Sequence, residues 1–197
     1  MALAEREPGP PPLLWQFLEG RAVLELGAMA WLYPLLRQAP AGDGHPVLVL
    51  PGFLASGNST YPLRRFLKSL GYAAHRWKLG RNLGRAGEIE EQLSGRLREL
   101  RLRYGRRVSV IGWSLGGVYA RELAWLAPED VRLVITLGSP FRHQAGTSVT
   151  LLFEDISGQR VSQLDPAQLL RLSRPPPVPA TSIYSRTDGV VHWRSSL

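Results

Sequence analysis

Residues 110–117 read Val-Ile-Gly-Trp-Ser-Leu-Gly-Gly, an apolar run followed by a turn of small residues. Within it, Gly112-Trp113-Ser114-Leu115-Gly116 fits G-x-S-x-G, a pattern that places a serine on a sharp turn between a strand and a helix. The turn needs both glycines, because a Cβ two residues before or after the serine would collide with neighbouring backbone. The flanks agree, since 107–111 read as a buried strand and 118–126 as a helix. Ser114 is therefore the candidate nucleophile, and an idle serine in a glycine-rich turn is the alternative.

Strand and helix patterns alternate along the chain from residue 47 onward. This alternation is typical of an α/β fold, with a doubly wound, mostly parallel sheet covered by helices on both faces. The segment 141–179 interrupts the alternation with polar stretches and three consecutive prolines. We expect it to form an insertion or lid over the carboxyl ends of the strands, where ligands bind in such sheets. The predicted strands are 47–50, 72–77, 107–111, 131–137 and 180–185, and the other predicted helices are 88–104 and one that Ser59 or Thr60 caps and that runs through Leu70.

The length and composition are those of an ordinary globular protein. The chain has 197 residues, of which 44% are hydrophobic and 20% charged, enough for one domain with a substantial core. We place this domain at 45–197 and assign 1–44 to an N-terminal helix and linker. Cysteine is absent from the sequence, which excludes disulfides and thiolate metal sites.

The apolar segment 13–36 raises the question of a membrane. Glu19, Arg21 and Glu25 interrupt it, so no stretch of about 20 residues is free of charge as a spanning helix requires. Acidic residues and prolines before it do not fit a signal peptide, and we expect a cytoplasmic protein. Apolar residues recur at roughly helical spacing, which predicts an amphipathic helix. We expect it to pack on the domain, with peripheral membrane contact through 13–36 as the alternative.

The net charge of +8 is weak evidence for a nucleic-acid partner. The densest basic run, 96–107, follows a helical segment that presents Leu93, Leu97 and Leu100 on its opposing face. A solvated helix face explains such a run, although attraction to an anionic lipid or an acidic partner is the alternative. The sequence contains no known nucleic-acid-binding motif, and its aromatic residues do not alternate with the arginines. We therefore expect no nucleic-acid partner.

A serine nucleophile needs a base, an acid that orients the base, and two amide donors for the oxyanion. Asp188 stands at a predicted strand end, after the serine in chain order, and is the candidate acid; a plain Asp-Gly turn is the alternative. One oxyanion donor is the amide of Leu115, at the start of a helix where amides are free. The other is expected in the loop after the first strand, at Phe53, with Leu54 as the neighbouring alternative.

The chain resembles an α/β-hydrolase of the lipase and esterase type over about residues 45–197. This resemblance implies hydrolysis of a small-molecule or lipid ester through an acyl-enzyme on Ser114, with no metal and no organic cofactor. Acyl transfer would use the same residues, and neither the acyl-chain length nor the oligomeric state can be read from the sequence. The resemblance rests on four stretches in this order: Val47-Leu48-Val49-Leu50-Pro51-Gly52-Phe53, Gly112-Trp113-Ser114-Leu115-Gly116-Gly117, Thr136-Leu137-Gly138-Ser139-Pro140 and Ser185-Arg186-Thr187-Asp188-Gly189-Val190-Val191.

The base histidine departs from the family pattern. In the family it follows one more strand after the acid, whereas this sequence ends at Leu197. His192 follows the acid by only four residues, and His143 lies in the insertion, in the wrong chain order; these are the two candidates. His45 and His75 are expected to be structural. We expect that a C-terminal segment with the last strand and the histidine is missing, so a catalytically impaired hydrolase or a lipid- or partner-binding module is the alternative function.

Overall fold

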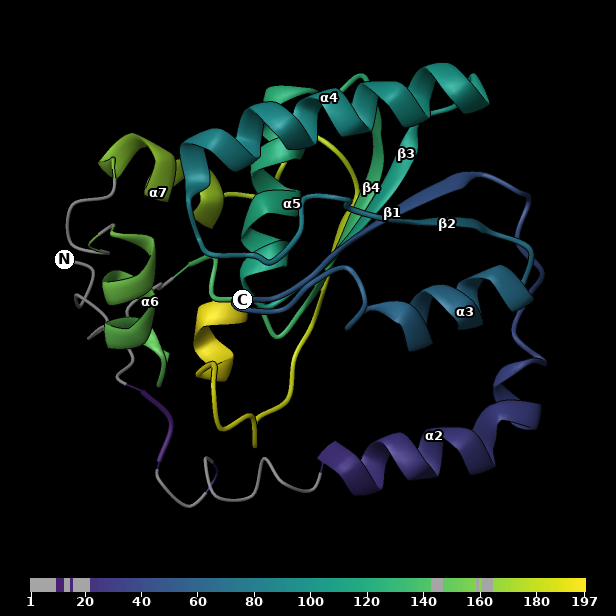
Figure 1. The fold of residues 1–197 in the computed structure, drawn as a ribbon, viewed down its shortest axis with the longest axis horizontal. Helices are drawn as coiled ribbons and strands as arrows, with labels where there is room; N and C mark the ends of the chain where they lie inside the picture. Colours follow the sequence, from purple (N-terminus) through teal and green to yellow (C-terminus); the bar gives the residue numbers. More distant parts are fainter. Residues whose placement is uncertain (1–9, 13–14, 16–21, 143–146, 159, 161–164) are drawn as a thin grey trace, which may run out of the picture.

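A computed structural model of the protein contains one five-stranded sheet (Figure 1). It describes residues 10–12, 15, 22–142, 147–158, 160 and 165–197. All strand pairs are parallel, and the order in the sheet is β2-β1-β3-β4-β5, so the predicted parallel α/β architecture is confirmed. The second and fifth strands are shorter than the sequence predicted. The strands are β1 (Pro46–Leu50), β2 (Ala73–Arg76), β3 (Val108–Trp113), β4 (Val131–Leu137) and β5 (Ala180–Ile183).

Helices cover both faces of the sheet (Figure 1). The chain leaves β1 toward β2 through α3 (Tyr61–Ser69), and then passes back over β1 through α4 (Ala86–Tyr104) to reach β3. Because such crossovers are right-handed, the change of direction puts α3 on one face and α4 on the other. The helix α5 (Leu115–Leu126) shares the α4 face. The sheet is therefore doubly wound, and its order reverses between β1 and β3.

The core follows the period of two that a strand requires. In β1, Leu48 and Leu50 pack with α4 and α5, whereas Val47 and Val49 pack on the α3 side. The helix α4 contributes three fully buried leucines, as its spacing predicted. The solvated face predicted for 96–107 does not include Arg96, which is 7% exposed and bonded to Glu99. The three leucines are Leu93, Leu97 and Leu100.

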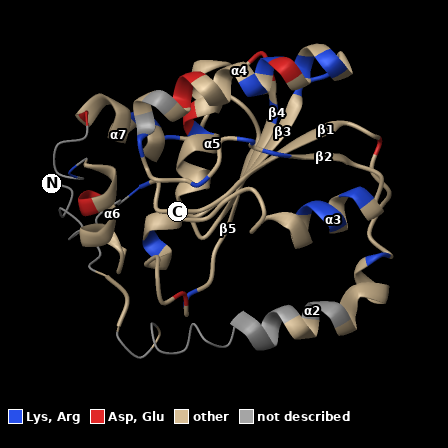
Figure 2. Ribbon diagram, in the orientation of Figure 1, with Lys and Arg blue, Asp and Glu red and all other residues tan. Residues whose placement is uncertain are grey.

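Basic residues are spread over both sides of the sheet. Figure 2 shows Lys and Arg on α3, below the sheet in this view, and on α4, above it. Five of the residues between 98 and 107 are arginines, and most of these are exposed. The positive charge therefore does not gather on one helix.

An N-terminal helix, α2 (Ala22–Leu36), is present as predicted, but its predicted amphipathic character is wrong for these residues. Glu25 is its single charged residue, and apolar residues occur around its whole circumference. The leucines and phenylalanine that suggested one apolar stripe lie mostly at 13–14 and 16–21, outside the described residues. The helix contacts the domain where the ring of Tyr33 meets that of Phe66 on α3, with centroids 6.3 Å apart.

Several large apolar side chains of α2 face away from the domain. Trp31 is 88% exposed, and Leu32 and Leu35 are also exposed. Among the described residues, no helix has both the length and the apolar composition needed to cross a bilayer. Peripheral membrane contact through 13–36 stays a prediction.

The segment 141–179 contains two helices, although its polar stretches suggested loops. The helix α7 (Pro166–Ser173) packs against α5 and completes the crossover from β4 to β5. The helix α6 (Thr150–Ser157) instead lies beside the turn that bears Ser114. The alternation of strand and helix therefore continues through this segment, and an insertion or lid at 141–179 stays a prediction.

Candidate active site

Ser114 occupies a strained turn between β3 and α5. Its backbone has φ 51° and ψ −122°, a conformation that is sparsely populated by non-glycine residues and costs about 1–3 kcal/mol. Its amide donates to the carbonyl of Leu137 at the end of β4 (2.8 Å). The surrounding glycines make this turn sterically feasible: a Cβ on Gly112 would lie 2.2 Å from the carbonyl oxygen of Gly116, and one on Gly116 would lie 2.6 Å from that of Leu50. The structure thus shows the collisions that the sequence predicted.

The serine lies where the sheet order reverses. Ser114 follows β3 and Phe53 follows β1, the two neighbouring strands between which the chain changes direction. Ligands of doubly wound sheets bind at this point, beyond the carboxyl ends of the strands. A cavity of about 50 Å³ opens there, with a predominantly apolar lining. It is lined by Phe53, Ser114, Leu115, Val118, Pro140, Thr147, Val149, Thr150, Phe153 and Val191.

Two backbone amides near Ser114 have the character of oxyanion donors. Leu115 is the first residue of α5, where amides have no partner within the helix. In the loop after β1, the amide of Leu54 already donates to the carbonyl of Asn82 (2.7 Å). The amide of Phe53 has no acceptor among the described residues. Of the two alternatives in this loop, Phe53 is therefore the better candidate.

Two further residues shape this loop, and sequence patterns did not identify them. Asn82 is fully buried, and its side-chain amide donates to the carbonyl of Pro51 (3.0 Å). It therefore ties the loop after β1 to the loop after β2. Phe153 of α6 meets the ring of Phe53 edge-on, with centroids 5.4 Å apart, and narrows the cavity. A single buried asparagine and a lone phenylalanine carry no distinctive local signal in the sequence.

Asp188 lies close to the strand end that supports Ser114. Its Oδ1 accepts hydrogen bonds from the amides of Val190 and Val191, each at 2.8 Å. Its Oδ2 faces Gly138, only 3.0 Å from where a Cβ on that residue would stand. Gly138 directly follows Leu137, which accepts the bond from the Ser114 amide. The carboxylate and the serine thus flank the same short stretch of backbone.

His192 does not line the cavity that contains Ser114. With Asp188 it lines a separate hollow, and its Nδ1 accepts from the amide of Arg194 (3.3 Å). Its ring lies nearly parallel to that of Trp193, with centroids 6.0 Å apart. The preceding residue, Val191, does line the cavity of Ser114. His143, the other candidate base, lies outside the described residues.

Solved structures with this architecture include several lipases. The chain is similar to the mature form of Bacillus licheniformis lipase BlEst2, with a TM-score of 0.55, 18% identity and coverage of 80% of this chain and 81% of that one. The chain has the α/β-hydrolase fold. It is also similar to Aspergillus fumigatus lipase B, with a TM-score of 0.57, 20% identity and coverage of 78% of this chain and 41% of that one. No family model and no curated protein sequence matches it.

The chain spans 44% of the propeptide form of BlEst2, at 15% identity and a TM-score of 0.55. It therefore covers less than half of two of these three lipase structures. At such identities the likeness establishes the hydrolase fold, and the chemistry of this chain has to be argued from its own residues.

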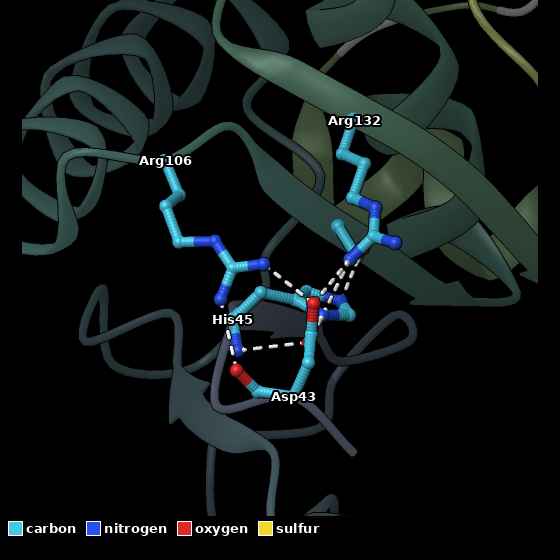
Figure 3. Close-up of polar contacts among 5 residues, drawn as sticks. Asp43, His45, Arg106 and Arg132 are labelled. Atoms are coloured by element: carbon cyan, nitrogen blue, oxygen red, sulfur yellow. Dashed lines mark hydrogen bonds and ion pairs between the residues drawn. The ribbon is translucent and has the colours of Figure 1, made fainter.

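His45 belongs to a polar cluster at the amino ends of the strands, the end of the sheet opposite to Ser114 (Figure 3). Its Nδ1 is bonded to Asp43 and its Nε2 lies 2.9 Å from the Ser109 hydroxyl. Arg106 also donates to the Asp43 carboxylate (2.5 Å), and Arg132 approaches it (3.7 Å). The hydrogen bond with His45, and next that with Arg106, holds the pKa of Asp43 below its ordinary value. Asp43, His45 and Ser109 resemble an acid–histidine–serine set. Ser109, however, is 3% exposed and lies at the amino ends of the strands. The cluster therefore connects the linker to the sheet.

His75 lies in β2, and its Nε2 is bonded to the hydroxyl of Tyr104 (2.9 Å). Burial, and then the nearby Arg96 and Arg103, lowers its pKa to about 4. The folded protein therefore binds this proton less readily than the unfolded chain does, which titrates near 6.5. The contribution of neutral His75 to the free energy of unfolding has its full value above pH 6.5 and decreases as the pH falls toward 4.

We expect the substitution His75→Gln to make the free energy of unfolding depend less on pH between pH 7 and pH 4. Because the side chain is only partly buried, we expect the parent to lose about 1–2 kcal/mol of unfolding free energy between pH 7 and pH 4 through this group, less than the full shift would give. Urea unfolding at a series of pH values measures the effect. An equally steep loss in the variant would contradict the role of His75.

Proposed function

We propose that this protein is a serine hydrolase of carboxylic esters. The observation that carries the proposal is the backbone of Ser114, which holds φ 51° at the junction of β3 and α5. Strain of this kind persists only where the surrounding structure maintains it, and it gathers at catalytic sites. The lipase structures that share the fold support the same reaction class.

In the proposed reaction, the Ser114 hydroxyl attacks the ester carbonyl as a base takes its proton. The negative charge that develops on the carbonyl oxygen is stabilised by the amides of Phe53 and Leu115. The alcohol leaves with a proton from the base, and water then hydrolyses the acyl-enzyme to release the acid. Asp188 orients the base.

His192 is the proposed base among the described residues, and its geometry imposes a condition. Asp188 and His192 already line one hollow, so the acid and the base are neighbours. His192 lies next in the chain to Val191, which borders the serine's cavity. The role of His192 therefore requires that its imidazole reach the Ser114 hydroxyl from beside Val191.

The cavity supports an apolar acyl group as the part of the substrate beside Ser114. Its lining is predominantly apolar, and apolar surface favours hydrocarbon over charged groups. Phe153 restricts the space. Esters of small molecules or lipids with a short acyl chain fit this description.

A second candidate function is a binding module that keeps the cavity without catalysis. It is favoured by the placement of His192, which lines the hollow of Asp188 and not the cavity of Ser114. Without an activating base, a serine hydroxyl is a poor nucleophile. The two functions differ in the reactivity of Ser114.

Covalent labelling with a fluorophosphonate probe separates the two functions. We expect the parent protein to be labelled once, and Ser114→Ala to be unlabelled. The substitution Ser69→Ala, at an exposed serine on α3, is the matched control and should be labelled like the parent. Hydrolysis of p-nitrophenyl acetate and butyrate should fall on the order of 10³-fold or more in Ser114→Ala. A folded parent that resists the probe but binds a fluorescent fatty acid would overturn the hydrolase in favour of the binding module.

A further inference from the structure

A second, larger hollow lies at the carboxyl end of β2, beside the loop that follows β1. Its volume is about 390 Å³, and its lining is more polar than apolar. The loop after β1 contributes Ser56, Gly57 and Asn58, and the end of β2 contributes Arg76 and Lys78. The two cationic side chains are both exposed, so they are accessible to a ligand.

A third cation, Arg64, stands behind the wall of this hollow. Its guanidinium donates to the carbonyl of Gly57 (2.9 Å) and to the hydroxyl of Thr60 (3.0 Å), and the residue is 9% exposed. Burial, and next the positive charge of Arg76, lowers the pKa of Arg64. Arg64 and Arg76 both lie beside Gly57, Arg64 through its hydrogen bond to the carbonyl and Arg76 through its side chain.

Among the described residues, these three positive charges have no carboxylate partner. Within the described part of the chain, none of Arg64, Arg76 and Lys78 forms an ion pair. The hydrogen bond with Arg96, and to a smaller extent the charge of Lys78, lowers the pKa of Glu99. The Glu99 carboxylate is therefore already bonded to Arg96. Cations gathered around one hollow raise the local concentration of anions and lower the cost of holding one there.

The backbone brings the two walls of the hollow together. A Cβ on Gly57 would lie 3.3 Å from the Cβ of Arg76, so the absence of a side chain lets the loop approach β2. Lys78 adopts φ 67°, which is uncommon for a residue with a side chain. Ser56 and Asn58 supply a hydroxyl and an amide at the same wall, groups that complement charged donors in binding phosphate oxygens.

We propose that this hollow binds a phosphate group. Arg76 and Lys78 provide the charge, and the side chains of Asn58 and Ser56 provide neutral hydrogen bonds to the remaining oxygens. The phosphate is carried by a small phosphomonoester or by a lipid headgroup, and the recognition chemistry is the same for both. The site is separate from the cavity of Ser114, although Phe53 and Ser56 belong to the same loop.

Calorimetric titration with inorganic phosphate and with glycerol 3-phosphate, at constant ionic strength in chloride, tests the site. We expect one phosphate per protein, and at least tenfold weaker binding in the double variant Arg76→Gln/Lys78→Gln. The double variant Arg85→Gln/Arg98→Gln removes the same charge from exposed residues outside the hollow and should bind like the parent. Ser114→Ala should also bind phosphate normally, so failure of the ester chemistry does not affect this test.

Co-sedimentation with phosphatidylcholine vesicles that contain phosphatidic acid identifies the source of the phosphate. Capture that glycerol 3-phosphate reverses supports a lipid headgroup, whereas binding of the soluble phosphates alone supports a small phosphomonoester. Equal weakening in the two double variants would show a nonspecific charge effect and overturn the site. Absence of saturable phosphate binding by the folded parent would also overturn it.

Discussion

Replacing Gly112 with alanine is expected to lower the free energy of unfolding by about 3 kcal/mol or more, beyond the usual range for a single added methyl group. The new Cβ would lie 2.2 Å from the carbonyl oxygen of Gly116 and 2.4 Å from the Cα of Gly117. Both obstacles are backbone atoms in the first turn of α5, so no side-chain rotation relieves the contact. The turn must open, and Ser114 then loses the strained conformation on which its proposed reactivity depends.

Gly95→Ala is the matched control for this substitution. Gly95 lies within α4, and a Cβ there would meet nothing within 4 Å. Alanine in a helix is favoured over glycine, so we expect this variant to gain about 0.5–1 kcal/mol. Urea unfolding monitored by circular dichroism measures both variants. A Gly112→Ala protein within 0.5 kcal/mol of the parent would contradict the steric argument.

The elbow was predictable because its determinants are local. Glycines at fixed spacing around Ser114, with an apolar run before them, specify the turn within a few residues of sequence. The strands were predictable for the same reason, since β1 is a fully apolar run that is buried on both faces. Local patterns failed for α6 and α7, where polar residues and prolines resemble loops but tertiary packing supports helices.

The arrangement of Asp188 and His192 depends on long-range geometry. Asp188 lies near Gly138, at the strand end beside Ser114, and its role as the acid stays a prediction. No local pattern specifies the direction in which the segment after Asp188 turns, and it places His192 in a different hollow. Similarly, the choice between the amides of Phe53 and Leu54 as oxyanion donor depends on Asn82, whose carbonyl accepts from the Leu54 amide. Asn82 lies 28 positions beyond Leu54 in the chain. Contacts of this kind become visible only in the folded structure.

Arg121→Met is expected to destabilise the protein by about 3 kcal/mol, because buried carbonyls left without a donor each cost about 1–3 kcal/mol. Arg121 of α5 is 6% exposed, and it donates to the carbonyls of Leu172 (2.9 Å) and Arg174 (2.6 Å) at the end of α7. Its guanidinium also lies 3.9 Å from the centre of the Phe141 ring. Methionine fills much of the space but satisfies neither carbonyl.

The cost of burying the guanidinium opposes this loss without cancelling it. Burial lowers the pKa of Arg121 to about 10, so the side chain remains charged at neutral pH, and removing it relieves some desolvation. Arg121→Lys should also destabilise, since the compact ammonium of lysine lacks the planar fork of the guanidinium and cannot reach both carbonyls with the same geometry. Arg98→Met, at an exposed residue of α4, should change stability by less than about 0.5 kcal/mol.

Urea unfolding of the three variants measures these differences. If Arg121→Met matched Arg98→Met, the carbonyls at the end of α7 would not depend on Arg121, and the anchor of the β4-to-β5 crossover would have to lie in the contact of Arg171 with Glu122 (2.9 Å).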